Sequence, residues 1–250
     1  MTLESDGPSE AGLGNREATV AAEWTDAPVS VSDVTVGGRT WRRLLVKTPW
    51  IHSGDDLETI LRVSLLPHAE PNDLIVLSEK ATTIALGAVV PIDTVTVGPL
   101  ARRMARMVRP RGVSKGLSIP EKMQYVIDEI GRPRAVLALI AAGLTRPLGI
   151  RGAFYLVAGR RARAMDGGRP PFEHLLLPPL TPQQSHAEAS ALRRVLGYDV
   201  AISDMNDRGG SIRAVSGGPI PPRLLRRILA DNPMGQRDAR TPIGLVRQMR

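Results

Sequence analysis

The chain has 250 residues, 42% of them hydrophobic, which is enough for a real core in one large domain or two small ones. Cysteine is absent, which excludes disulfides, thiolate catalysis and cysteine-bound zinc. The histidines are scattered without an HExxH-like pair, so we expect no histidine-bound zinc. The net charge of +8 invites a nucleic-acid interpretation, but only 3% of the residues are aromatic. The stacking platforms of single-strand binders are therefore missing, and a nucleic-acid partner is not expected.

The N-terminal region differs from the rest of the chain. Residues 1–28 carry six carboxylates against one arginine, which predicts a disordered acidic tail before a single domain over residues 29–250. The longest apolar run, residues 135–144, is half as long as a membrane span requires and indicates a core helix. No signal peptide is recognisable at the N-terminus. We therefore expect a cytoplasmic protein without membrane contact.

The first predicted elements alternate irregularly. Residues 34–49 indicate two strands joined by a Gly-Gly turn, and residues 53–66 indicate a helix with Ser53 as its N-cap. Residues 72–80 indicate a buried strand, and residues 83–91 a second extended piece.

The second half of the chain contributes more helices than strands. Helices are predicted within residues 101–116 and over residues 118–131, 132–147, 181–197 and 221–232. The helix at 118–131 has Ser118 and Glu121 as a capping box, and the helix at 181–197 has Thr181 and Gln184. Residues 152–168 indicate a strand, a turn and a strand, and residues 198–203 and 241–248 indicate further strands. This order predicts an α+β fold with mixed or antiparallel sheets and packed helices.

Two glycine-rich stretches contain aspartates after predicted strands. In AISDMNDRGG, Asp204, Asn206 and Asp207 follow an apolar run, and in RAMDGG Asp166 precedes two glycines. Carboxylates in such a position suit a hard cation such as Mg²⁺, and Asp, Asn and Gly equally suit an ordinary turn. If the fold brings Asp166 and Asp204 together, they could hold divalent cations beside a nucleotide triphosphate.

Familiar nucleotide motifs are missing, because the sequence has neither a P-loop nor a GxGxxG fingerprint. Four stretches, however, resemble the coenzyme F420-0:L-glutamate (gamma-glutamyl) ligase family, and in particular its shorter stand-alone relatives. These stretches are SEKATTIALG (78–87), the long segment from GLSIPEK to RAMDG (116–167), ISDMNDRGG (202–210) and DNPMGQRDARTPIGLVR (231–247). The resemblance covers residues 44–247, and the four stretches keep the family's order.

The resemblance implies an amide ligase with a mixed α+β, F420-0 ligase-like fold. Such an enzyme uses GTP and Mg²⁺ or Mn²⁺, activates a small-molecule carboxylate as an acyl phosphate, and joins it to an amino acid such as glutamate. The family forms intertwined homodimers. The metal-binding positions implied are Asp166, Asp204 and Asp207. The nucleotide-binding positions implied are Thr48, Pro49, Trp50, Ile51, Lys80, Gly87, Gly235 and Gln236.

Some pocket positions depart from the family pattern. Met205 stands where the ligases carry Thr or Ser, and Leu86 and Ala88 replace a Glu and an Arg. Ile84 replaces a lysine, and Ala239 an acidic residue. Because these changes remove polar groups, three alternatives stay open: a ligase for another amino acid and carboxylate, a catalytically silent nucleotide-binding paralogue, and a nucleic-acid binder that uses the arginine clusters. The choice between GTP and ATP also stays open.

Overall fold

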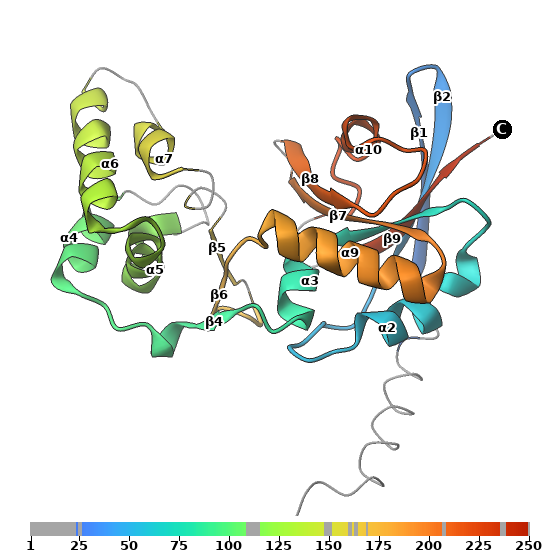
Figure 1. Ribbon diagram of the computed structural model, residues 1–250, viewed down its shortest axis with the longest axis horizontal. Helices are drawn as coiled ribbons and strands as arrows, with labels where there is room; N and C mark the ends of the chain where they lie inside the picture. The colour runs from blue at the N-terminus through green and yellow to red at the C-terminus, as the bar shows by residue number, and fades with distance from the viewer. Residues whose placement is uncertain are drawn as a thin grey trace, which may run out of the picture. The chain divides into compact units, whose positions relative to one another are not determined.

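The computed structural model describes residues 24, 27–108, 116–147, 152–159, 162, 165–168, 170–206, 209–235 and 239–249. The chain divides into two compact units: Met1–Leu86 with Thr181–Arg250 form unit 1, and Gly87–Leu180 form unit 2. Each unit combines helices with a sheet (Figure 1), so the predicted α+β class is confirmed. The single domain predicted for residues 29–250 stays a prediction.

Unit 1 is built on a six-stranded mixed sheet with the order β1-β2-β9-β3-β7-β8. Its only parallel pair among the described strands joins β3 to β7, and all other neighbours are antiparallel. The turn between the first two strands uses Gly37 and Gly38, both at positive φ, as predicted. The strands are β1 (Val29–Val36), β2 (Arg39–Val46), β3 (Leu74–Ser78), β7 (Asp199–Asn206), β8 (Gly209–Val215) and β9 (Ile243–Gln248).

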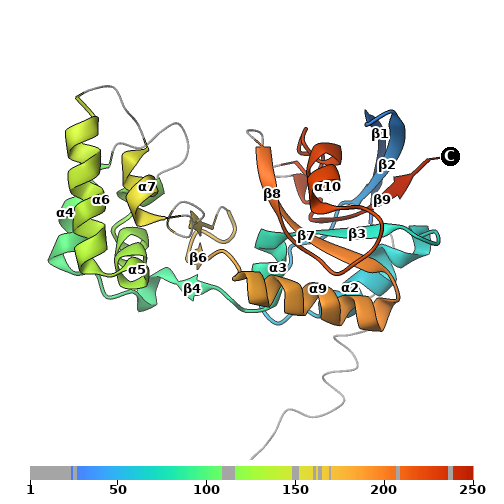
Figure 2. The same cartoon turned by 45° about the horizontal axis from the view of Figure 1, so that its top comes forward.

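Helices cover both faces of this sheet (Figures 1 and 2). One face packs against α2 (Leu57–Ser64), α3 (Glu79–Ala85) and α9 (Pro182–Leu196) through a shared apolar cluster. The other face packs against α10 (Pro222–Ile228) through a second cluster. Trp24, inside the predicted tail, is buried in the first cluster. Residues 1–23 lie outside the described part of the chain.

Two local predictions in unit 1 were wrong. The helix predicted from Ser53 begins at Leu57, because the carboxylate of Asp56 accepts hydrogen bonds from the N–H groups of Glu58 and Thr59. The extended piece predicted for residues 83–91 begins in a helix, since α3 runs to Ala85, and only Val90–Pro91 form a strand. By contrast, the predicted capping box of α9, Thr181 with Gln184, is confirmed.

In its described part, unit 2 has four α-helices around one apolar cluster and a small sheet with the order β4-β6-β5. The helices are α4 (Pro99–Met107), α5 (Pro120–Ile130), α6 (Arg132–Thr145) and α7 (Ala153–Ala158). The strands are β4 (Val90–Pro91), β5 (Asp166–Gly167) and β6 (Leu175–Leu177). Short 3₁₀ turns occupy Leu66–His68 in unit 1 and Ile92–Thr94 and Gly116–Ser118 in unit 2.

Three predictions in unit 2 were wrong. The first strand predicted within residues 152–168 is the helix α7, held between two positive-φ glycines at its ends. The N-cap of α5 is Ile119, without a side-chain capping bond, although the predicted stop at Gly131 is correct. The helix α6 is not a core helix, because only Ala135 and Ala138 are buried. An apolar stripe on it stays exposed and comprises Val136, Leu137, Ile140 and Leu144.

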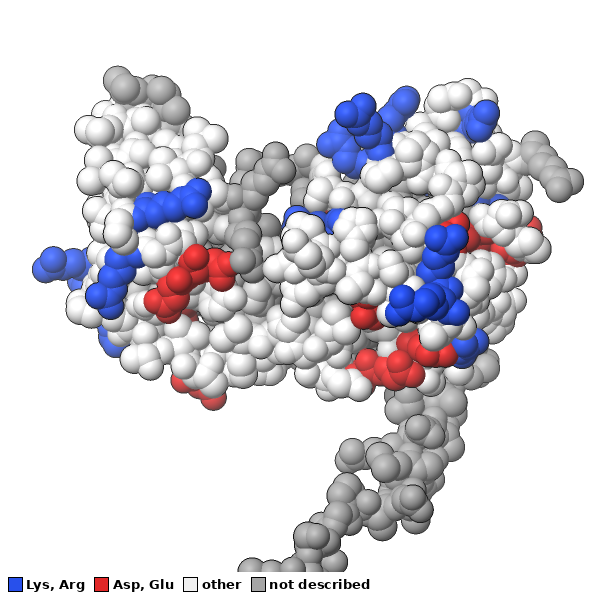
Figure 3. Space-filling view, viewed as in Figure 1, with Lys and Arg blue, Asp and Glu red and all other residues white. Residues whose placement is uncertain are grey.

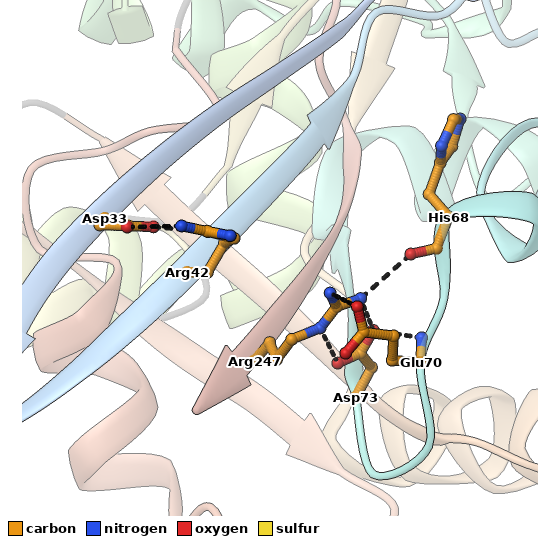
Figure 4. A network of polar contacts seen from close by, with 6 residues as sticks. All are labelled: Asp33, Arg42, His68, Glu70, Asp73 and Arg247. Atoms are coloured by element: carbon orange, nitrogen blue, oxygen red, sulfur yellow. Dashed lines mark hydrogen bonds and ion pairs between the residues drawn. The ribbon is translucent and has the colours of Figure 1, made fainter. Parts of the chain in front are cut away.

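A buried ion pair fixes one end of the unit 1 sheet (Figure 4). Arg247 on β9 donates from Nε and Nη2 to the two carboxylate oxygens of Asp73, at 2.8 and 2.7 Å. Nη2 also donates to the carbonyl of His68, and Nη1 pairs with Glu70. The hydrogen bond to Asp73 raises the pKa of Arg247 above its ordinary value. Figure 4 also shows the exposed pair Arg42–Asp33, in which the arginine lowers the pKa of the aspartate.

We expect Arg247→Met to lower the free energy of unfolding by about 3–5 kcal/mol, because it leaves the fully buried carboxylate of Asp73 uncompensated. Urea unfolding followed by circular dichroism measures this change. The control is Arg42→Met, which breaks the solvent-exposed pair with Asp33 and should leave stability nearly unchanged. Equal losses in the two variants would contradict the prediction.

Candidate functional site

The strand register brings several distant segments to one edge of the unit 1 sheet. Val46 and Leu77 both pair with Ile243, and Ser78 pairs with Ser203. The C-terminal ends of β2, β3 and β7 and the start of β9 therefore lie side by side. Every predicted site residue of unit 1 follows one of these strand ends or belongs to β7 or the loop before β9. This edge is the candidate site.

The segment after β2 is fixed against the loop before β9. The N–H of Thr48 donates to the carbonyl of Arg240 at 2.8 Å, and the guanidinium of Arg240 lies over the ring of Trp50, 5.8 Å from its centre. Pro49 lies between them and is partly buried, and Ile51 is buried in the core. The Thr48 hydroxyl is buried without a hydrogen-bond partner in the described part of the chain.

The start of α3 places a buried acid and an exposed base at the edge. The N–H of Ser78 donates to the carbonyl of Pro242 at 2.8 Å, which ties the end of β3 to the loop before β9. The next two residues begin the helix: Glu79 is 4% exposed, and Lys80 is exposed. Lys80 therefore places a positive charge at this edge.

Asp204 lies within β7 rather than after it, because β7 continues to Asn206 and forms a hairpin with β8. Val200, Ile202 and Asp204 alternate onto the face that α3 covers, whereas Ser203 and Met205 face the α10 side. Met205, one of the departures from the family, therefore points away from Asp204. Gly210 packs closely against β7, because a Cβ on Gly210 would lie 2.3 Å from the carbonyl oxygen of Asp204.

A guanidinium links Asp204 to Glu79. Arg213 donates from Nε to Glu79 at 2.9 Å and from Nη2 to Asp204 at 3.0 Å. Ile202 pairs with Ala214 and Ser203 with Ile212, so Arg213 is skipped in the register and forms a β-bulge. Bulges redirect side chains, often beside active sites. No sequence signal pointed to Arg213, and the buried Glu79 was missed although it adjoins Lys80.

The loop before β9 contributes Gly235 to the edge. Gly235 is exposed at a φ of 68°, and its N–H donates to the carbonyl of Asn232. A Cβ there would lie 2.6 Å from the Cβ of Ala239, so this turn requires glycine. Met234 beside it contacts the buried hydroxyl of Ser203.

The other predicted site residues either belong to unit 2 or lie outside the described part of the chain. Gly87 and Asp166 belong to unit 2, where Gly87 is the first residue and Asp166 pairs with Leu177 across β5 and β6. Gln236, Asp207 and the side chain of Asp166 lie outside the described part of the chain. Their predicted roles stay predictions.

The described residues contain no group of three His, Cys, Asp or Glu side chains that could hold a metal. Two carboxylates, Glu79 and Asp204, nevertheless meet at one guanidinium. Magnesium usually binds proteins through one or two carboxylates, with water and substrate phosphates as its other ligands. The donor set therefore fits a Mg²⁺ or Mn²⁺ ion bound together with a nucleotide.

Arginines also gather away from this edge. Figure 3 shows basic side chains over α10, where Arg223, Arg226 and Arg227 are exposed. Unit 2 exposes a second basic set on α4: Arg102, Arg103 and Arg106. Neither helix contains an aromatic residue. Their arginines could contact phosphates, but the helices have no ring on which a nucleic-acid base could stack.

The fold is that of a mixed α+β protein, and its candidate site at the sheet edge is polar, with carboxylates, a lysine and a glycine turn. A family model for the F420-0:Gamma-glutamyl ligase matches residues 45–205, more than half of the chain. The chain therefore belongs to the F420-0:gamma-glutamyl ligase family, as the sequence motifs predicted, and a ligase of that kind is supported. No individually curated protein matched the sequence. No helix in the described ranges is long and apolar enough to cross a membrane.

We expect Thr48→Val to raise the free energy of unfolding by about 1 kcal/mol, because it removes a buried hydroxyl without a partner and keeps the side-chain shape. The matched control is Thr83→Val in α3, whose buried hydroxyl donates to the carbonyl of Glu79 at 2.8 Å. That variant should lose about 0.5–1.5 kcal/mol. Urea unfolding measures both changes. A lower free energy of unfolding in Thr48→Val would contradict the conclusion that the Thr48 hydroxyl has no hydrogen-bond partner.

Proposed function

We propose that the protein is a nucleotide- and divalent-metal-dependent ligase that joins a small-molecule carboxylate to the amine of an amino acid. GTP supplies the phosphoryl group that converts the carboxylate into an acyl phosphate, and the amine then displaces phosphate. The acceptor is the coenzyme F420-0 precursor or a related carboxylate, and the amino acid is glutamate or a close analogue. The family match supports the ligase. The finer assignments are proposed from the resemblance of the sequence stretches to that family.

The observation that carries the proposal is the convergence at one sheet edge. The segment after β2, the start of α3, Asp204 on β7 and the glycine turn before β9 are far apart in sequence and meet through the strand register. Triphosphate oxygens need cations and main-chain N–H groups. The edge carries the positive charge of Lys80 and the exposed turn at Gly235, and the hydroxyl of Thr48 is buried beside them.

The roles proposed for these residues are binding and orientation. Asp204, with Glu79 beside it, would hold the divalent cation, which supplies charge neutralisation for the triphosphate when it is bound. Lys80 neutralises phosphate charge, and Gly235 lets the backbone approach the nucleotide closely. Trp50 and Arg240 fix the segment after β2 against the loop before β9. The proposed metal role extends to Asp166 and Asp207. The proposed nucleotide-binding role extends to Gly87 and Gln236.

One second candidate has support in the structure: a catalytically silent paralogue that binds nucleotide. The carboxylate of Asp204 is already paired with the guanidinium of Arg213. Two departures from the family, Leu86 and Ile84, place an exposed and a buried apolar side chain at the end of α3. Nucleotide binding without turnover would favour this candidate over the ligase.

We expect Asp204→Asn to weaken the metal-dependent binding of GTP at least about tenfold, because it removes the charge of the proposed metal ligand. Calorimetric titration of GTP, and then of ATP, with and without Mn²⁺ measures this change. The control is Asp33→Asn, which alters an exposed carboxylate paired with Arg42 at the other end of β2. Unchanged GTP affinity in Asp204→Asn would refute the metal role of Asp204.

Turnover separates the two candidates. A ligase should release phosphate from GTP only when both the carboxylate acceptor and the amino acid are present. The first pair to test is the F420-0 precursor with glutamate, followed by other acidic and small amino acids. Metal-dependent nucleotide binding with no phosphate release across the panel would identify the silent paralogue, and no nucleotide binding would reject both.

We also propose that the protein acts in the cytoplasm as a homodimer, and the exposed apolar stripe of α6 supports self-association. Leu137 is 59% exposed and Leu144 is 70% exposed, and residues at this spacing share one helix face. The double variant Leu137→Glu, Leu144→Glu should therefore sediment as a monomer where the wild type sediments as a dimer. The control is Val195→Glu, an exposed apolar position on α9. A double variant that still dimerises would exclude α6 from the interface.

A further inference from the structure

Arg240 differs from the other arginines beside the unit 1 sheet. Arg42, Arg213 and Arg247 each pair with a carboxylate. The exposed guanidinium of Arg240 lies instead over the ring of Trp50, 5.8 Å from its centre. This contact engages the face of the ring and uses no oxygen acceptor. Within the described ranges, no side-chain hydrogen bond or ion pair engages the guanidinium of Arg240.

Hydrogen bonds hold the backbone of Arg240 in place at the candidate site. Its carbonyl accepts from the N–H of Thr48 at 2.8 Å, which joins it to the segment after β2. The hydroxyl of Thr241, the next residue, donates to the carbonyl of Met234 and closes the loop before β9. The side chain of Arg240 therefore extends from a fixed point, and this reduces the entropy that a ligand would lose on binding.

The backbone conformation of Arg240 is unusual for a residue with a side chain. Its φ is 48°, in the left-handed region where the Cβ of an L-residue is crowded and glycine is preferred. Gly235 in the same loop has a φ of 68°. The loop alone would be satisfied by glycine at position 240, so its conformation gives no reason for an arginine. Such strain clusters at ligand sites, where the side chain has a function.

An oxyanion is the ligand that this side chain fits. A guanidinium carries five N–H donors in one plane, and two of them match the spacing of two oxygens in a phosphate or carboxylate group. Contact with the ring of Trp50 restricts the position of that plane. Charge-assisted, bidentate hydrogen bonds of this kind are about twice as strong as neutral ones.

We propose that Arg240, held over the ring of Trp50, binds an oxyanion of a substrate at the candidate site. The group bound is a phosphate or a carboxylate, held by two N–H donors of the guanidinium. The inference deepens the proposed function, on which it rests for the identity of the substrate. A ligase of that kind provides two sources of oxyanion: the phosphates of the nucleotide and the carboxylates of the molecules that it joins.

The test is the affinity of the full chain for inorganic tripolyphosphate and for glutamate, measured by calorimetry with a chelator present. Arg240→Gln should weaken the binding of one of them at least about tenfold, because the charged fork is lost. Arg240→Lys keeps the charge without the planar fork and should restore only part of the affinity. The matched control is Arg223→Gln, which removes an exposed arginine from α10 and should change neither affinity.

The anion affected identifies the source. Loss of tripolyphosphate binding assigns Arg240 to the nucleotide phosphates, and loss of glutamate binding assigns it to a carboxylate substrate. Wild-type protein that binds neither anion, unchanged affinity for both in Arg240→Gln, or an equal loss in Arg223→Gln would overturn the proposal.

A second variant separates binding from folding. Arg240→Gly removes the guanidinium and relieves the crowding at a φ of 48°, so its melting temperature should stay near that of the wild type. It should nevertheless lose the same anion as Arg240→Gln. Retained anion binding in Arg240→Gly would show that the guanidinium is not the ligand, and would overturn the proposal.

These results are separable from the proposed function. A protein that binds an anion through Arg240, but shows no metal-dependent binding of GTP, would keep the role of Arg240 and lose the ligase. A protein that turns over GTP, yet binds both anions equally in wild type and Arg240→Gln, would keep the ligase and lose the role of Arg240.

Discussion

The parallel pairing of β3 with β7 is the constraint on which the candidate site depends. Parallel neighbours end at the same edge of a sheet, so the end of β3, with Glu79 and Lys80 after it, must lie beside Asp204. β9 runs antiparallel between β2 and β3, and this brings its preceding loop and the segment after β2 to the same place. A shift of one residue in the β3–β7 register would move Asp204 away from α3 to the opposite face.

Two local signals in the sequence were reliable. The Gly-Gly turn before β2 and the capping box of α9 depend on neighbouring residues, and both were predicted correctly. Local preference misled at α3, where Thr82 and Thr83 favour a strand by propensity. In the structure their hydroxyls instead donate to the carbonyls of Ser78 and Glu79 one turn back in the helix. Tertiary packing of α3 against the sheet decides this conformation.

The site itself could be predicted only in part. Lys80, Asp204 and the glycine turn before β9 were proposed by resemblance, because they sit in short recognisable stretches, and the strand register brings them to one edge. Arg213 and Glu79 were missed for a physical reason: their roles arise from a bulge between two strands, and a bulge depends on cross-strand pairing rather than on composition. Met205 illustrates the same limit, since strand alternation places it on the face away from Asp204.

The two ends of the unit 1 sheet use the same chemistry for different purposes. At the far end, Arg247 satisfies both oxygens of a fully buried carboxylate, and the pair joins β9 to the loop before β3. At the site end, Arg213 divides its donors between two acids that are unequally exposed. Arg247 therefore holds β9 against the loop before β3. Arg213 instead joins the start of α3 to the β7–β8 hairpin, because its two donors reach Glu79 on α3 and Asp204 on β7. The second contact lies at the edge where the candidate site residues gather, so it fixes the position of α3 relative to Asp204.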